Sequence, residues 1–320
     1  MLDKIIIDGL SFALPLFVMA IGGIYSERSG ITNLALEGLQ GAGAFVGALV
    51  AIFLMQICGA NSQIPYYAAM FFAMVGGMLY AMLHAVLCVK FKANQVISGV
   101  VVNILAMALT VFLTKVVNRL AFGELSDKFV LGVSERWTIP VLSRIPLLGA
   151  VFTDMYPFEL IIVVVSAFCW YLLYCTKYGL HLRACGDNPQ AVDAAGIDVG
   201  RVRFSAVMVS GALSGLAGMC FAYSISAKYS STIYVGYGYL SIAALIFGNW
   251  KIMPTLAACL LFGLAKSGGY QIVQAAGMPS SYSDLVMILP YVLTLLLLVF
   301  FSKHNNSPRA LGEVYDKGKR

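Results

Sequence analysis

Nine long apolar runs dominate the sequence and decide what the chain can fold into. Most are close to the roughly 20 residues that an α-helix needs to cross a bilayer core. Because lipid offers backbone N–H and C=O groups no partner, runs of this length must form helices rather than barrel strands. The sequence therefore predicts an all-α fold, a polytopic transmembrane helix bundle of about nine spans (range eight to ten). In chain order the runs are residues 5–24, 34–57, 64–89, 96–117, 157–176, 204–225, 238–249, 252–272 and 284–302.

Composition supports this class and excludes several others. Only 11% of the residues are charged and 60% are hydrophobic, whereas soluble domains carry about 25% charged residues. So few polar side chains could not cover a soluble enzyme, a nucleic-acid-binding protein or a disordered scaffold. The seven cysteines form no C-x-x-C pair and the three histidines lie far apart, so we expect no metal site. The first apolar run is too long for a signal peptide and should remain as a span.

Basic residues indicate how the spans are oriented. With segments 177–203 and 303–320 placed in the cytoplasm, thirteen Lys and Arg residues lie inside and six lie outside. An excess of basic residues on the cytoplasmic side is usual in membrane proteins. We therefore expect one transmembrane domain over 1–320, with an extracytoplasmic loop at 118–156, a cytoplasmic loop at 177–203 and a cytoplasmic tail at 303–320. An odd number of spans then places the N-terminus outside.

The cytoplasmic loop contains the pattern of a short capped helix. Asp187 and Asn188 are typical of a helix start, and Pro189 suits the first helical position. Gly196 is typical of a helix end. The sequence thus predicts about two turns of helix at 188–196. The cap and the small apolar face of this helix comprise Asp187, Asn188, Pro189, Ala191, Ala194, Gly196 and Ile197.

Polar residues inside the apolar runs are candidates for function. Asn33, Glu37 and Gln40 follow one another at intervals of four and three residues, which predicts one shared helical face. Asn103 lies deepest in the fourth run. The alternative is structural. Glu37 could pair with Arg28 or accept backbone N–H groups at a broken helix, and Asn103 could hydrogen-bond to a neighbouring helix.

Tyrosines gather between the sixth and seventh runs. Anchoring at the membrane surface is a common use of tyrosine and is what we predict here. The alternative is a stacking site for a planar ligand. The residues are Tyr223, Tyr229, Tyr234, Tyr237 and Tyr239.

Motifs for catalysis are missing from the sequence. It contains no G-x-x-x-x-G-K-[ST], no G-x-S-x-G and no H-E-x-x-H, so we expect neither ATP binding through a P-loop nor an enzymatic activity. The functions that the sequence leaves open are transport, channel activity and a structural or scaffold role.

Five stretches spread over nearly the whole chain carry recognisable motifs: 27–38 (ERSGITNLALEG), 94–106 (NQVISGVVVNILA), 186–218, 244–263 and 308–318. Together they resemble the permease subunits of bacterial ABC importers, in the nucleoside and simple-sugar branch of the ribose and branched-chain amino-acid permease superfamily. The tail resembles that of the shorter of the paired nucleoside permeases. One departure is the insertion of Lys251 and Met253 before Pro254, which leaves the start of the adjoining helix open.

The resemblance implies a type II ABC importer-like fold in the bacterial cytoplasmic (inner) membrane. It implies a second, non-identical permease subunit, a cytoplasmic ABC ATPase that uses ATP and Mg, and an extracytoplasmic substrate-binding lipoprotein. This chain would bind no cofactor and no nucleic acid, and would form half of the pathway for a nucleoside-like solute. The helix at 188–196 would be the coupling helix to the ATPase, and Asn33, Glu37, Gln40 and Asn103 would lie along the substrate pathway.

Other functions stay open at this point. The same machine could import riboflavin or a simple sugar, since a separate binding protein selects the cargo first. An ion-coupled secondary transporter or channel would suit the Gly-rich, broken runs, although the sequence shows no internal repeat. A membrane scaffold would depend on loop 118–156 alone.

Overall fold

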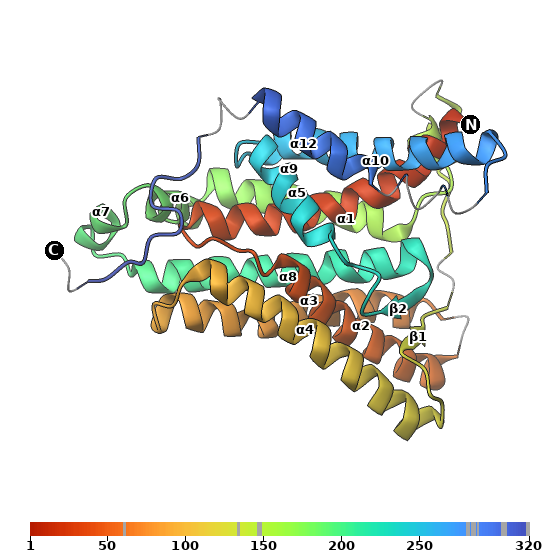
Figure 1. Ribbon diagram of the computed structural model, residues 1–320, viewed down its shortest axis with the longest axis horizontal. Helices are drawn as coiled ribbons and strands as arrows, with labels where there is room; N and C mark the ends of the chain where they lie inside the picture. Colours follow the sequence, from red (N-terminus) through yellow and green to blue (C-terminus); the bar gives the residue numbers. More distant parts are fainter. Residues whose placement is uncertain are drawn as a thin grey trace.

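The computed structural model describes the chain except for residues 60–61, 133–134, 146–148, 280–281, 283–285, 287, 302–305 and 318–320. Long helices lie side by side, most of them along the longest axis of the molecule (Figure 1). They are α1 (Leu2–Arg28), α2 (Leu36–Cys58), α3 (Ile64–Ala85), α4 (Gln95–Val117), α5 (Pro157–Cys175), α8 (Val199–Ile225) and α10 (Ile252–Ala275). Two shorter helices pack with them, α9 (Tyr237–Phe247), which crosses the long axis, and α12 (Leu289–Phe301). The shorter elements are α6 (Lys177–Asp187), α7 (Pro189–Ala194), π-turns at Val86–Lys90 and Asn118–Phe122, 3-10 turns at Leu142–Arg144 and Gly149–Phe152, and strands β1 (Lys128–Val130) and β2 (Lys228–Ser230).

The prediction of a polytopic helical bundle is confirmed, and each apolar run contains a helix. Among the described residues, seven helices are long and apolar enough to cross a membrane. Nine complete spans are not confirmed, because α9 has 11 residues and α12 has 13. The beginning of the predicted run 284–302 lies partly outside the described residues.

Helices α1 and α8 form the centre of the bundle. In each of them 72% of the most apolar stretch is buried, compared with 28–39% in the other five long helices. Small residues allow the close packing that centres on α8. A Cβ atom added to Gly215 would lie 2.1 Å from the Ala73 carbonyl oxygen of α3, and one added to Gly43 of α2 would lie 2.4 Å from the Gly215 Cα. Glycine at these positions therefore lets three backbones meet.

Two helices begin inside the bundle. After α1 ends at Arg28, residues 29–35 run back without regular helix and α2 starts at Leu36. Asn33 thus precedes the helix, and the prediction that it shares a helical face with Glu37 and Gln40 is wrong. The short helix α9 has its first turn against the first turn of α2, where the Gly236 N–H donates to the Glu37 carboxylate.

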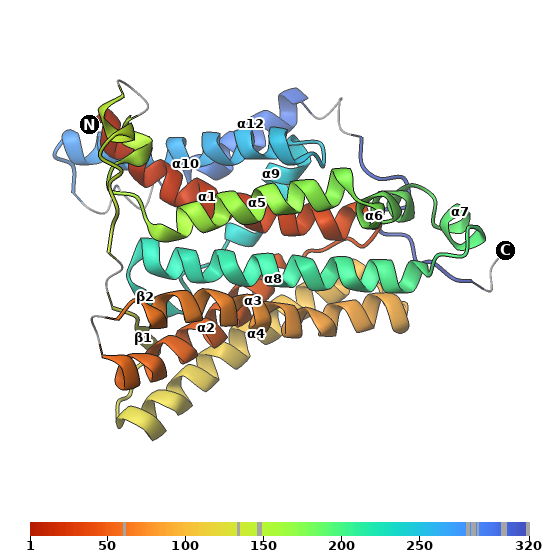
Figure 2. The same cartoon turned by 180° about the vertical axis from the view of Figure 1, so that it is seen from behind.

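The two ends of the bundle carry different structures. The N-terminus and the β1–β2 pair lie at one end, and α6, α7 and the C-terminus lie at the other (Figure 1). Figure 2 shows α5 and α8 running between these ends. Segments 118–156 and 177–203 therefore lie at opposite ends, as the predicted alternation of spans requires. The second segment is more helical than predicted, because it contains both α6 and α7 and because α8 starts at Val199.

Candidate functional site

A cavity of about 170 Å³ lies where α2, α4 and α9 meet. The wall combines backbone near two helix starts with side chains from α4 and from the segment before α9. Much of the wall is apolar, and five polar side chains and one exposed aromatic ring give it specific chemistry. They are Glu37, Asn103, Thr110, Ser231, Tyr234 and Tyr239.

Glu37 lies in the first turn of α2, where the helix dipole favours a negative charge. Its carboxylate accepts the N–H of Gly236 at 2.8 Å, so it also faces the start of α9. A Cβ atom on Gly238 would lie 2.5 Å from the Glu37 Cβ, which explains why α9 carries glycine there. Arg28 instead donates from Nε to the Trp250 carbonyl oxygen at 3.0 Å. Of the two structural alternatives for Glu37, the backbone contact is therefore confirmed and the pair with Arg28 is wrong.

Asn103 reaches from α4 to the break before α2. Its Nδ2 donates to the Leu34 carbonyl oxygen and its Oδ1 accepts the Gly38 N–H, each at 2.7 Å. These bonds satisfy two backbone groups that the broken helix leaves open within the bundle. Asn103 thus makes the interhelical contact predicted as its structural alternative, and it lines the cavity as well.

Asn33 and Gln40 lie outside the cavity wall. Both are fully buried. Asn33 donates from Nδ2 to Ser210 Oγ of α8 at 2.9 Å and accepts the Ala35 N–H at 3.0 Å. Gln40 packs on α8 beside Gly218, where an added Cβ would lie 3.0 Å from the Gln40 Cγ. The structure thus brings Glu37 and Asn103 together and separates Asn33 and Gln40 from them.

Tyr234 lines the cavity and belongs to the tyrosine cluster for which the sequence left a ligand site open as the alternative. It is only 2% exposed, and among the described residues its hydroxyl group has no hydrogen-bond partner. Buried polar groups are nearly always paired, so this hydroxyl makes Tyr234 a candidate binding residue. The anchoring prediction is wrong for Tyr223, Tyr229 and Tyr234, which are buried inside the bundle. Of the five tyrosines, Tyr234 and Tyr239 line this cavity.

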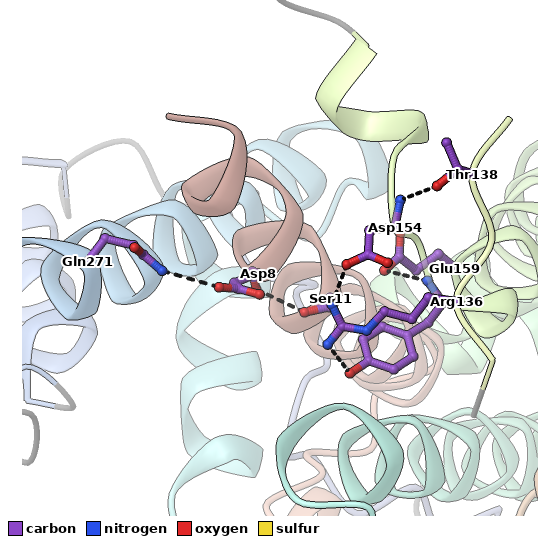
Figure 3. A network of polar contacts seen from close by, with 8 residues as sticks. Asp8, Ser11, Arg136, Thr138, Asp154, Glu159 and Gln271 are labelled. Atoms are coloured by element: carbon purple, nitrogen blue, oxygen red, sulfur yellow. Dashed lines mark hydrogen bonds and ion pairs between the residues drawn. The ribbon is translucent and has the colours of Figure 1, made fainter. Parts of the chain in front are cut away.

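A second cavity, of about 320 Å³, lies on the other side of the α9 start. Lys266 of α10 lines it, donates to the Tyr237 hydroxyl at 2.8 Å and lies 3.8 Å from the centre of the Phe12 ring. Asp8 of α1 faces the same cavity and accepts from Gln271 Nε2 at 3.5 Å (Figure 3). The start of α9 therefore lies between the Glu37 carboxylate, which accepts the Gly236 N–H, and the Lys266 amine, which donates to the Tyr237 hydroxyl.

The motif stretches 27–38 and 244–263 meet at the α7 end of the bundle. The Trp250 indole N–H donates to the buried Glu27 carboxylate at 2.5 Å. Trp250 has a φ of 54°, so the turn between α9 and α10 is left-handed at this residue. Helix α10 begins at Ile252, which places Pro254 in its first turn, where a missing N–H removes no helical bond. The structure thus places the helix start, which the sequence left open, two residues before Pro254.

Helix α7 confirms the predicted short capped helix. The Asn188 side chain accepts the Ala191 N–H at 3.0 Å, Pro189 is the first helical residue, and Gly196 has a φ of +81° beyond the end. Val192 packs inward at 5% exposure. Ala191 and Ala194 are exposed, so the small apolar face that the sequence predicts lies on the surface.

The opposite end carries a structured surface over segment 118–156. Arg136 forms an ion pair with Asp154 at 3.0 Å and donates to the Tyr156 hydroxyl at 2.8 Å. The Asp154 backbone N–H in turn donates to Thr138 Oγ1 at 3.0 Å (Figure 3). Glu159 at the start of α5 accepts the Tyr156 N–H at 3.3 Å. This network joins the predicted extracytoplasmic loop to the bundle.

Comparison with known proteins assigns the chain to a family. A family profile described as the branched-chain amino acid transport system / permease component matches residues 5–298. The chain is 35% identical to the guanosine ABC transporter permease protein NupQ of Bacillus subtilis, over 97% of this chain and 96% of the relative. It is 36% identical to the nucleoside ABC transporter permease protein NupC of Lactococcus lactis, over 99% and 98%.

A more distant relative carries another cargo in its name. The putative glucose ABC transporter permease protein TsgC13 of Haloferax volcanii is 29% identical over 79% of this chain and 72% of the relative. No solved structure matches the chain significantly. The profile covers most of the chain, and the two nucleoside relatives match it nearly end to end. The chain is therefore a multi-pass membrane protein that belongs to the family of branched-chain amino acid transport system permease components.

Proposed function

We propose that the chain is a permease subunit of an ATP-driven ABC importer and forms half of the translocation pathway for a nucleoside-like solute. The observation that carries this proposal is the nearly full-length similarity to permeases named for guanosine and nucleosides. We propose that the solute passes the cavity at the meeting of α2, α4 and α9.

The chemistry of the cavity suits a nucleoside. Ribose hydroxyl groups are hydrogen-bond donors that the Glu37 carboxylate can accept. The free hydroxyl of Tyr234 can pair with a hydroxyl group or a base edge, and the 47% exposed ring of Tyr239 offers a stacking surface. At about 170 Å³ the cavity in one chain is small for a ligand pocket. We therefore propose that a second, non-identical permease completes it.

The two ends of the bundle would contact different partners. The exposed alanines of α7 would enter a groove of a cytoplasmic ABC ATPase, which binds ATP and Mg. The Arg136 surface would receive an extracytoplasmic substrate-binding lipoprotein. We propose that the C-terminus lies in the cytoplasm of a bacterium and that the bundle spans its inner membrane.

A simple sugar is the second candidate cargo. The similarity to a putative glucose permease favours it, and sugars share their hydroxyl groups with ribose. A sugar has no planar base that could stack on the Tyr239 ring. Loss of this ring should therefore weaken binding of a nucleoside more than binding of a sugar.

Uptake by cells that express the complete complex tests the proposal. Labelled guanosine should accumulate, and excess unlabelled nucleoside should compete while excess glucose should not. Tyr234→Phe should raise the KM for guanosine about fivefold, since one hydrogen bond contributes about 1 kcal/mol. Tyr171→Phe, an exposed position on α5, is the matched control and should leave uptake unchanged. If only glucose competes with the labelled guanosine, the proposed cargo is a sugar and not a nucleoside.

A further inference from the structure

The C-terminal tail folds back over the α7 end of the bundle, where it passes α6 and ends beside α7 (Figure 1). Its backbone is pinned at two points. The Ala310 N–H donates to the Gly186 carbonyl oxygen at the end of α6 at 2.8 Å, and the Gly312 N–H donates to the Gly30 carbonyl oxygen at 3.1 Å. Ala310 is only 3% exposed. The tail is thus packed into the bundle as part of the fold.

Arg203 of α8 ties the tail to the segment that follows α1. Its side chain is buried, with the residue 3% exposed. Nε donates to the Ser29 carbonyl oxygen at 3.0 Å, and Nη1 donates to the Glu313 carbonyl oxygen at 2.9 Å. The planar guanidinium fork can bridge two backbone carbonyls in this way, whereas the single ammonium group of a lysine cannot reproduce its fixed geometry. Gly30, with a φ of +96°, leaves room for the fork, since an added Cβ would lie 2.5 Å from Nη2.

The last described residues of the tail contact α7 and its neighbours. Lys317 forms an ion pair with Asp193 of α7 at 3.2 Å, and Asp316 pairs with Lys92, before α4, at 2.7 Å. Tyr315 packs on the small apolar cluster of Cys185, Val192 and Val199, from α6, α7 and α8. Exposed ion pairs contribute little to stability, so the packing of Tyr315 and the backbone bonds hold the tail.

Residues 29–35, which the tail and Arg203 contact, lead to the first turn of α2 beside the cavity. Residues 29–35 connect α1 to the first turn of α2, which carries Glu37. The same segment is fixed from α4, because the Thr32 N–H donates to Gln95 Oε1 at 2.7 Å. The tail therefore contacts α7 through Lys317 and, five residues earlier in the chain, segment 29–35 through Gly312.

We propose that Arg203 and the tail residues 308–317 are positioning residues that transmit movement of α7 to segment 29–35, and thereby couple ATP hydrolysis to solute movement. This inference depends on the proposed function, since it takes α7 as the contact to an ATPase. Loss of the link should leave a complex that assembles and hydrolyses ATP but moves little solute.

Two variants of the full complex in proteoliposomes test the link. One ends the chain at Val314, which removes Tyr315 and both ion pairs and keeps the backbone bonds of Ala310 and Gly312. The other is Arg203→Lys. The matched control is Arg201→Lys, whose side chain is 89% exposed. The readouts are ATPase bound per permease, ATP hydrolysed, guanosine moved per ATP, and ATP-dependent hydrogen–deuterium exchange in residues 29–35.

Both variants should bind the ATPase and hydrolyse ATP within twofold of the unmodified complex. Guanosine moved per ATP should fall at least tenfold, and the ATP-dependent change in exchange at 29–35 should disappear, while the control behaves as unmodified. Unchanged transport per ATP, or a parallel loss of ATPase binding and transport, would overturn the link. If the unmodified complex moves no guanosine, the proposed cargo fails. The exchange measurement requires the complex and ATP but no transported solute. If ATP does not change hydrogen–deuterium exchange in residues 29–35 of the unmodified complex, that result alone overturns the link.

Discussion

Glu37, Asn103 and Tyr234 show how single residues serve both the fold and the site. Glu37 and Asn103 bind backbone groups at the starts of α2 and α9, where the helices leave N–H and C=O groups open. Both side chains also line the cavity. Tyr234 differs, because its buried hydroxyl has no partner among the described residues. Polar residues within apolar runs could be found from sequence, but burial of a tyrosine depends on long-range packing that no local pattern records.

Substitution of Glu37 by Gln tests the charge at the cavity. The amide keeps the shape and can still accept the Gly236 N–H, so expression should stay within twofold. Guanosine uptake should fall about tenfold or more, since hydrogen bonds to a charged group contribute about 1.5–3 kcal/mol. Uptake and membrane protein level are measured on the same cells. An equal fall in both would assign Glu37 to folding alone.

Trp250→Phe probes the contact between the two motif stretches. It keeps the ring and removes the N–H that pairs with the buried Glu27 carboxylate. The carboxylate keeps its bond from the Asn33 backbone N–H, but loss of one hydrogen bond to a buried charged group costs about 1.5–3 kcal/mol, so the thermal midpoint of the purified chain should fall. Adding Glu27→Gln should recover part of the loss, because a neutral side chain is less costly to bury with fewer hydrogen bonds. Additive losses in the double variant would contradict a direct contact.

At the scale of elements, helices that start inside the bundle position the site. Hydropathy locates the apolar runs and the gap between the first two, but it does not show that residues 29–35 in this gap are mostly buried inside the bundle. The sequence predicts that each of the nine runs contains a helix, and the short run 238–249 already indicates that α9 is shorter than a complete span. Local capping is more predictable. The sequence predicts α7 from Asn188, Pro189 and Gly196, because each of these residues acts through hydrogen bonds or backbone angles within a few residues.

Gly196→Pro tests the element that would contact the ATPase. Proline fixes φ near −65°, which is incompatible with the φ of +81° at this position. We expect distortion of the α7 end and loss of ATPase pull-down and uptake, with normal membrane insertion. A variant that still couples ATP hydrolysis to uptake would contradict the coupling role of α7. Asn188→Ala, which loses only the cap at a cost of about 1 kcal/mol, should give a milder loss.

At the scale of the whole molecule, we propose that the two ends of the bundle face different compartments. Cys58 at the end of α2 and Cys175 at the end of α5 are exposed, while Cys88, Cys169, Cys185, Cys220 and Cys259 are buried. The excess of basic residues around α6, α7 and the tail supports a cytoplasmic location of that end. The tail itself could not be predicted to join these parts, since its backbone bonds connect residues more than a hundred positions apart.

Labelling of the exposed cysteines checks this orientation. A membrane-impermeant maleimide should label Cys58 on intact cells and should leave Cys175 unmodified. Inverted membrane vesicles should give the reverse pattern. Single Cys58→Ser and Cys175→Ser variants identify each band. Labelling of Cys175 on intact cells would contradict the proposed orientation, because it would place the α7 end of the bundle outside the cell.

ATP-driven uptake into proteoliposomes tests the central claim most directly. Vesicles should contain this chain, the second permease and the ATPase, with substrate-binding protein added outside and ATP enclosed. The account predicts guanosine accumulation that requires enclosed ATP and both permeases, and that falls when Glu37→Gln replaces the unmodified chain. Guanosine uptake by this chain alone, driven by an ion gradient without ATP, would contradict the account.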